Sequence, residues 1–182
     1  MFINQLGSVY HLLRNYYQIS TKVIKERGYI FIRDEKSAQR FGISESIPGL
    51  LIPCLSTRGK SEYYVYCPKG FCFWRERTVC DPNYQTPYNN WVLSQEHLVD
   101  CPPSCFQDII NSNKTLYIAD NQRLSDSLVS RGLCSITILN LWFLESSGQE
   151  ALDYLKFELE PVNFSNREVS AYAGACRTVK PE

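Results

Sequence analysis

The sequence is short of several features that would narrow its function at once. It carries no net charge, because 19 basic residues balance 19 acidic ones, and it has one methionine and only two histidines. The most apolar stretch, residues 135–144, is interrupted by Thr137 and Asn140 and is far shorter than the ~18 apolar residues of a membrane-spanning helix. The N-terminus lacks the basic and apolar segments of a secretory signal peptide. We therefore expect a cytoplasmic protein with no membrane partner.

Charge is unevenly distributed along the chain, although the total is zero. Between Arg14 and Arg77 there are 12 basic residues and six acidic ones, whereas the chain from Cys101 onward has seven basic and ten acidic residues. The basic part also carries many aromatic residues. Such a segment can follow a phosphate backbone and stack on bases, although aromatic residues in strands more often build a core. The neutral total therefore does not exclude a nucleic-acid partner.

The eight cysteines allow three interpretations. A disulfide framework requires an oxidising compartment, and the missing signal peptide argues against one. A zinc site uses ligand pairs that lie about two to four residues apart. The pair Cys101/Cys105 has that spacing, and the pair Cys67/Cys72 nearly has it. Alternatively, the cysteines are separate reduced thiols that pack as small hydrophobic residues.

Hydrophobic periodicity and turn signals predict an α+β fold with two subdomains. Residues 1–79 should form a head with N-terminal helices and a small antiparallel sheet, residues 80–113 an irregular Pro- and Asn-rich connection, and residues 114–182 a β-α-β unit. In the first helix, the apolar stripe includes Tyr10 and Leu13. The first two strands of the β-α-β unit should run parallel, because a helix connects them. The expected helices cover residues 3–17, 22–27, 35–41, 122–130 and 149–157, and the expected strands cover residues 29–32, 50–55, 61–66, 71–78, 116–119, 134–139 and 169–173.

Several phrases of the first half occur in a characteristic order. They are Lys25-Glu26-Arg27-Gly28-Tyr29, then Ser37-Ala38 with Phe41-Gly42-Ile43, then Ile47-Pro48-Gly49-Leu50-Leu51-Ile52-Pro53, and finally the turn Arg58-Gly59-Lys60 before Tyr64. Together they resemble the N-terminal domain of plasmid and phage replication proteins of the primase–helicase type. In that family, opening helices precede a small sheet that is entered through such a Pro-Gly-Leu-Leu-Ile-Pro strand.

The second half resembles the start of a toprim-like unit, with a strand, a helix and the turn Arg131-Gly132-Leu133 in the family's order. A toprim centre holds Mg²⁺ with a Glu after the first strand and an Asp-x-Asp pair after a later one. Here Asp120 stands at the Glu position, and Gly174 and Cys176 stand where the pair of acids belongs. The resemblance therefore implies a degenerate, truncated unit without toprim-type catalysis, unless Asp120 meets other carboxylates. The candidates are Asp126, Glu145 and Glu150.

These resemblances imply a non-catalytic accessory or remnant of mobile-element DNA replication, which binds DNA, single-stranded or duplex, or a replication protein. We infer no small-molecule substrate and no cofactor, while Mg²⁺ and Zn²⁺ stay open. A basic hairpin turn and its neighbours are the expected nucleic-acid contacts: Arg58, Lys60, Tyr64, Lys69, Trp74, Arg75 and Arg77. The alternative is a protein-interaction module anchored by the Tyr-rich loop at residues 81–91. A zinc ion bound by Cys67, Cys72, Cys101 and Cys105 could stabilise this module.

Overall fold

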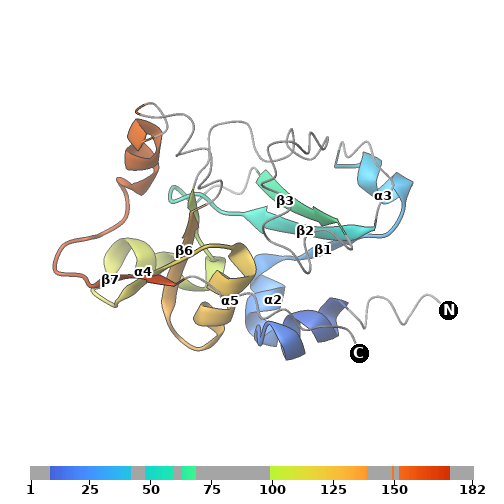
Figure 1. Cartoon of the computed structure of the whole chain (residues 1–182), viewed down its shortest axis with the longest axis horizontal. Coiled ribbons are helices and arrows are strands. Elements are labelled where there is room, and N and C mark those ends of the chain that lie inside the picture. Colours follow the sequence, from blue (N-terminus) through green and yellow to red (C-terminus); the bar gives the residue numbers. More distant parts are fainter. Residues whose placement is uncertain are drawn as a thin grey trace.

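The computed structural model describes residues 9–41, 48–59, 63–68, 99–138, 149 and 152–172. It shows an α+β protein, as the sequence predicts, with a three-stranded antiparallel sheet and a four-stranded mixed sheet (Figure 1). The antiparallel sheet occupies the right-hand half of the view, and the mixed sheet occupies the left-hand half.

Local signals at the N-terminal helices explain where they begin and end. The segment η1 (Leu12–Tyr16) is π-helical and continues a helical turn at residues 9–11. The helix α2 (Thr21–Arg27) begins after Ser20, whose side chain accepts a backbone hydrogen bond from the first turn. It ends at Gly28, which adopts a left-handed conformation with φ 73°. Glycine takes this conformation without the steric cost that a Cβ would bring.

The antiparallel sheet has the order β1–β2–β3. Its members are β1 (Ile30–Ile32), β2 (Gly49–Cys54) and β3 (Tyr63–Pro68). The short helix α3 (Glu35–Gln39) follows β1 and begins with a capping box between Asp34 and Ser37. The sequence assigns a strand of this sheet to residues 71–78, which lie outside the described residues. In the structure, β1 supplies the second neighbour of β2.

The mixed sheet has the order β4–β6–β5–β7. Its members are β4 (Val99–Asp100), β5 (Leu116–Ala119), β6 (Cys134–Ile138) and β7 (Val169–Tyr172). The strand β5 pairs in parallel with both β6 and β7. The helix α5 (Gln122–Ser130) connects β5 to β6. The predicted parallel β-α-β pattern is therefore confirmed.

Part of the stretch that the sequence predicts to be irregular contains regular elements. The strand β4 pairs antiparallel with β6 and is followed by the 3-10 turn η3 (Pro103–Cys105) and the helix α4 (Phe106–Asn111). The expectation of an irregular connection therefore does not hold for this part. A strand of two residues has no periodicity that a sequence pattern can show. Residues 69–98 lie outside the described residues, so the boundary at residue 80 stays a prediction.

One hydrophobic core runs through both predicted subdomains. Its buried members include Leu13, Val23, Leu50, Ile52, Val99, Ile109, Leu116 and Ile136. A smaller cluster contains Ile32, Ala38 and Leu51. Because successive strand residues point to opposite faces, Leu50 and Ile52 join the large core from one face of β2, and Leu51 joins the small cluster on the other. The helix at residues 152–159 packs against the large core through Leu155 and Leu159.

Candidate functional site

Asp120, which stands at the position of the toprim Glu, lies between the end of β5 and the start of α5. Its side chain is exposed, and its Oδ1 accepts a 2.7 Å hydrogen bond from the Asn121 amide. Asn121 also caps α5, because its side-chain oxygen accepts from the Leu124 N–H at 2.9 Å. Within the described ranges, no three His, Cys, Asp or Glu side chains are grouped in a way that could hold a metal ion.

Asp126 is one of the carboxylates that could complete an acidic cluster with Asp120, but it forms an ion pair with Arg27. Its side chain is fully buried in α5, whereas Asp120 is exposed to solvent. The structure therefore does not join these two acids into one cluster. Glu145 and Glu150 lie outside the described residues.

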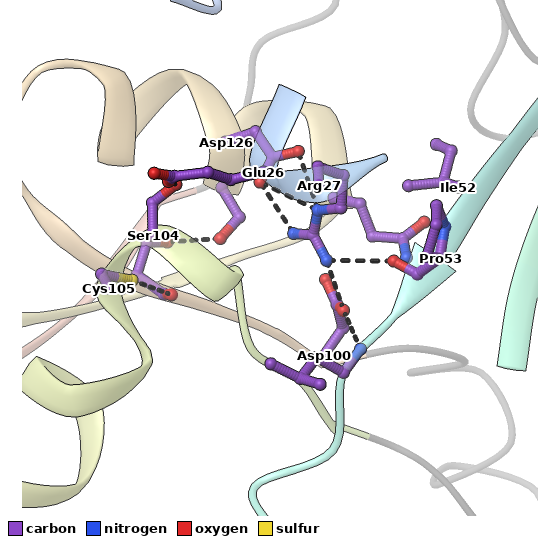
Figure 2. Close-up of polar contacts among 12 residues, drawn as sticks. Glu26, Arg27, Ile52, Pro53, Asp100, Ser104, Cys105 and Asp126 are labelled. Carbon is purple, nitrogen blue, oxygen red and sulfur yellow. Dashed lines mark hydrogen bonds and ion pairs between the residues drawn. The ribbon is translucent and has the colours of Figure 1, made fainter. Parts of the chain in front are cut away.

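Arg27, the last residue of α2, is the centre of a buried network of charges (Figure 2). Its Nε lies 3.0 Å from Asp126 Oδ2, and its Nη2 lies 2.7 Å from Asp126 Oδ1. Its Nη1 donates to Asp100 Oδ1 at 2.7 Å and to the Pro53 carbonyl oxygen at 3.1 Å. The guanidinium and both carboxylates are fully buried. One side chain thus connects α2 to β2, β4 and α5.

Further hydrogen bonds and burial set the charge states of this network. The Leu55 N–H donates to Asp100 Oδ1 at 3.0 Å, and the Tyr29 hydroxyl donates to Asp126 Oδ2 at 2.5 Å. Burial opposes the charge on Arg27, but the two carboxylates outweigh it and raise the pKa of Arg27 well above its ordinary value. Burial raises the pKa of Asp100 against the opposing effect of Arg27. Burial, reinforced by Asp126, raises the pKa of Tyr29. The network therefore holds elements together and presents no reactive group to solvent.

Two of the predicted nucleic-acid contacts are engaged within the protein. Arg58 pairs with Glu160 at 3.1 Å, and its guanidinium lies 4.2 Å from the centre of the Phe157 ring. Tyr64 is half-buried, and its ring packs edge-on against Phe41 with 5.5 Å between ring centres. These contacts compete with phosphate binding by Arg58 and with base stacking on Tyr64. The other predicted contacts lie outside the described residues: Lys60, Lys69, Trp74, Arg75 and Arg77.

Three of the four cysteines of the zinc hypothesis are described. Cys67 lies in β3, whereas Cys101 and Cys105 follow β4, and all three are buried thiols. Burial raises the pKa of Cys101 well above its ordinary value, as expected for a thiol that packs as a small hydrophobic group. Cys72 lies outside the described residues, so the four-cysteine site stays a prediction.

The N-terminal helices and the end of α5 carry six exposed aromatic and basic side chains that the sequence reasoning missed as a site. We call this set the N-terminal face, and its members are Tyr10, Arg14, Tyr16, Lys22, Lys25 and Arg131. All six residues are exposed, the two tyrosines by 39% and 44%, and the Tyr16 ring keeps this exposure although it packs edge-on against Tyr17 with 5.0 Å between ring centres. Its basic members form no ion pair with a described carboxylate, apart from a loose 3.9 Å contact between Lys22 and Glu26. Their positive charge is therefore available to an anionic ligand.

Two contacts link parts of the N-terminal face to neighbouring segments. The Tyr10 hydroxyl donates to the Thr21 hydroxyl at 3.0 Å, which places Tyr10 against the start of α2. Arg131, at the end of α5, donates to the Gln18 side chain. Arg14 follows Tyr10 by about one turn, where the helical turn at residues 9–11 continues into η1. Figure 1 shows α2 beside α5.

The sequence placed Tyr10 in a buried stripe together with Leu13. Leu13 is 1% exposed, but Tyr10 is 39% exposed and uses its hydroxyl at the surface. The spacing of four residues between Tyr10 and Arg14 is the local signal that indicates a mixed aromatic and basic side. Arg131 joins this surface through a contact across 113 residues, which no local pattern can show.

Comparison with known proteins gives no match: no family model, no curated protein and no solved structure matches the chain. Among the helices of the described ranges, none is long and apolar enough to cross a lipid bilayer. A function for this chain therefore has to be inferred from its sites.

Proposed function

We propose that this chain is a non-catalytic accessory protein of mobile-element DNA replication and that it binds single-stranded DNA through the N-terminal face. One observation carries the proposal: the exposed Tyr10 and Tyr16 belong to helices that also carry exposed basic side chains, and these cations form no close ion pair with a described carboxylate. Proteins that bind single strands combine such charges, which contact phosphates, with aromatic rings, which stack on bases. The resemblance of the first half to replication proteins supports the replication context.

The charge of the N-terminal face determines the expected salt dependence. If its four basic side chains each neutralise one phosphate, the logarithm of the binding constant falls against the logarithm of salt with a slope of about −2.8, because each phosphate contributes about 0.7 for single strands. The affinity then drops about 50-fold between about 50 and 200 mM salt. Stacking on the two tyrosines adds roughly 1–3 kcal/mol per base, because every base has an aromatic face.

Fluorescence anisotropy with a labelled single-stranded oligonucleotide across a salt series tests the proposal. The double variant Arg14→Gln/Lys25→Gln should reduce the steepness of the salt slope by about 1.4. The control Lys114→Gln/Lys156→Gln removes the same charge from two exposed lysines that form ion pairs elsewhere, and it should leave the slope unchanged. Lack of binding by the wild type at about 50 mM salt, or equal slopes for the two variants, would refute the proposal. Tighter binding of duplex than of single strands would show that stacking on the tyrosines is not the mode of recognition.

A replication protein is the second candidate partner, because several apolar side chains between residues 152 and 169 are exposed. They are Leu152, Phe157, Phe164 and Val169, with exposed fractions of 42–54%. Exposed apolar side chains of this size are typical anchors of protein interfaces. The double variant Leu152→Ser/Phe164→Ser should then abolish stoichiometric binding to the purified primase–helicase of the same element, measured by calorimetry. The affinity for oligonucleotide should not change.

A further inference from the structure

Arg167, just before β7, is a buried cation held mainly by carbonyl groups. It is 8% exposed, and its guanidinium donates to the carbonyl oxygens of Asp108, Ile109, Lys114 and Asn163. Its Nη2 also donates to Cys134 Sγ at 2.9 Å. Among the described residues, no carboxylate forms an ion pair with it. A buried charge is stabilised by a counter-charge, and the Cys134 sulfur is the one acceptor in this set that can itself become anionic.

A second thiol lies beside Cys134. The Sγ of Cys105, at the end of η3, lies 3.5 Å from the carbonyl oxygen of Ser135, the residue after Cys134, and each of the two thiols shifts the pKa of the other. The side chains come from different elements, η3 and β6, and the two residues are only 5% and 2% exposed. The fold therefore places two thiols together next to a buried guanidinium.

The surroundings favour a thiolate at Cys134. The hydrogen bond from Cys105, helped by the positive charge of Arg167, outweighs burial and lowers the pKa of Cys134 to about 7. The same hydrogen bond, with burial, raises the pKa of Cys105, which therefore stays a protonated donor. The other charged or titratable groups that face the pair are Asp108, Lys114 and Cys101. Asp108 opposes the thiolate, and its ion pair with Lys114 at 2.6 Å reduces that effect.

We propose that Cys134 and Cys105 form a peroxide-reactive dithiol, in which Cys134 attacks the oxidant and Cys105 converts the product to a disulfide. The Cys134 thiolate attacks one oxygen of hydrogen peroxide, so that an S–O bond forms, the O–O bond breaks, and the departing hydroxide takes up a proton to become water. The Cys105 sulfur then attacks the sulfur of the Cys134 sulfenic acid. An S–S bond forms, the S–O bond breaks, and the hydroxyl leaves with the Cys105 proton as a second water. The two thiols lose two electrons, and the peroxide gains them.

Hydrogen peroxide is the oxidant class that suits this site. Cys105 and Cys134 are nearly fully covered, so a bulky disulfide such as oxidised glutathione cannot approach in line with the attacking thiolate, whereas an oxidant as small as peroxide needs only a small local opening of the fold. Thiolate character, access and a nearby second thiol together make a cysteine selectively oxidisable. The disulfide would join η3 to β6 and close the chain between residues 105 and 134.

Peroxide oxidation of the full chain tests this inference, with the remaining thiols blocked by N-ethylmaleimide and the peptides identified by mass spectrometry. The native protein should give a linked Cys105–Cys134 peptide, and the urea-unfolded protein should show no preference for it. Because Cys134 ionises near pH 7, link formation should be about 10-fold faster at pH 8 than at pH 6, against about 80-fold for an ordinary thiol. Absence of the link in the native protein, or a rise close to 80-fold, would overturn the inference.

Variants separate this chemistry from a structural role. Cys105→Ser should leave the first attack intact but stop at the sulfenic acid, which dimedone traps. Arg167→Gln should slow oxidation at neutral pH several-fold, and Arg167→Lys, which keeps the charge, should restore most of the rate. Cys101→Ser removes another described thiol that faces the pair, so it is the matched control and should leave the link unchanged. A link that forms through Cys101, or equal rates for the folded Arg167→Gln variant and the wild type, would contradict the assignment. If Arg167→Gln does not fold, the pH dependence of the wild type decides.

Discussion

Replacing Arg27 by Met tests how the protein joins its two sheets. The substitution keeps much of the aliphatic volume but leaves Asp100 and Asp126 buried without their counter-charge. Removing one partner from a buried ion pair costs about 3–5 kcal/mol, and here one cation serves two fully buried carboxylates. We therefore expect Arg27→Met to lower the free energy of unfolding by at least about 3 kcal/mol. This is a large part of the roughly 5–15 kcal/mol that stabilises an ordinary domain.

The measurement is urea-induced unfolding at neutral pH, followed by circular dichroism. Arg27→Lys should recover only part of the loss, because one ammonium group cannot reach two carboxylates and the Pro53 carbonyl as the guanidinium does. Lys22→Ala, which removes the exposed 3.9 Å pair of α2, is the matched control. It should change the free energy of unfolding by less than about 1 kcal/mol.

Two outcomes would refute this reasoning. A loss below about 1 kcal/mol for Arg27→Met would mean that the buried carboxylates do not depend on their cation. Burial raises the pKa of Asp100, and Arg27→Met removes the cation that opposes this effect. An acid whose pKa is raised in the fold contributes stability at low pH and loses it as the pH rises. The loss caused by Arg27→Met should therefore be smaller at about pH 5 than at about pH 7. An equal loss at both pH values would show that charge is not the cause.

Two further predictions concern the same buried groups and the thiol pair. Tyr29→Phe removes the hydroxyl that donates to Asp126 at 2.5 Å and should lower the free energy of unfolding by about 1.5–3 kcal/mol in the urea assay; an unchanged value would contradict the charge-assisted bond. From about pH 7 to pH 9, the reduced protein should gain roughly 1.5 kcal/mol of stability relative to Cys134→Ser, because the pKa of Cys134 is lowered to about 7 in the fold and the unfolded thiol stays protonated to higher pH. Buried thiols with raised pKa values, such as Cys101, oppose this gain equally in both proteins. The relative gain is lost as the pH falls through 7, and an equal pH dependence of stability in the two proteins would contradict the lowered pKa.

Local contacts explain which parts of the fold can be predicted from the sequence. Ser20, Gly28 and Asp34 act within one turn of their own helices, so their roles are readable from neighbouring residues. The parallel pairing of β5 with β6 follows from the helix between them. The strand β4 has two residues and exists through its pairing with β6, so no pattern within it indicates a strand.

The candidate sites depend on contacts between distant residues, which limits what the sequence alone can show. Arg27 contributes to the basic surplus of the first half, yet the fold buries it against Asp100 and Asp126, which lie 73 and 99 residues away. Arg58 is an exposed cation at a turn, but Glu160 and Phe157 contact it from the far end of the chain. A count of charges therefore identifies a basic region without showing which cations reach solvent.

Photochemical cross-linking of a halogenated single-stranded oligonucleotide to the full chain tests the proposed DNA-binding face most directly, because it identifies the side chains that touch the bases. We predict cross-links in the peptides that contain Tyr10 and Tyr16, and their loss in the folded variant Tyr10→Ala/Tyr16→Ala. Cross-links confined to other peptides, or none at low salt, would contradict the proposed DNA-binding face.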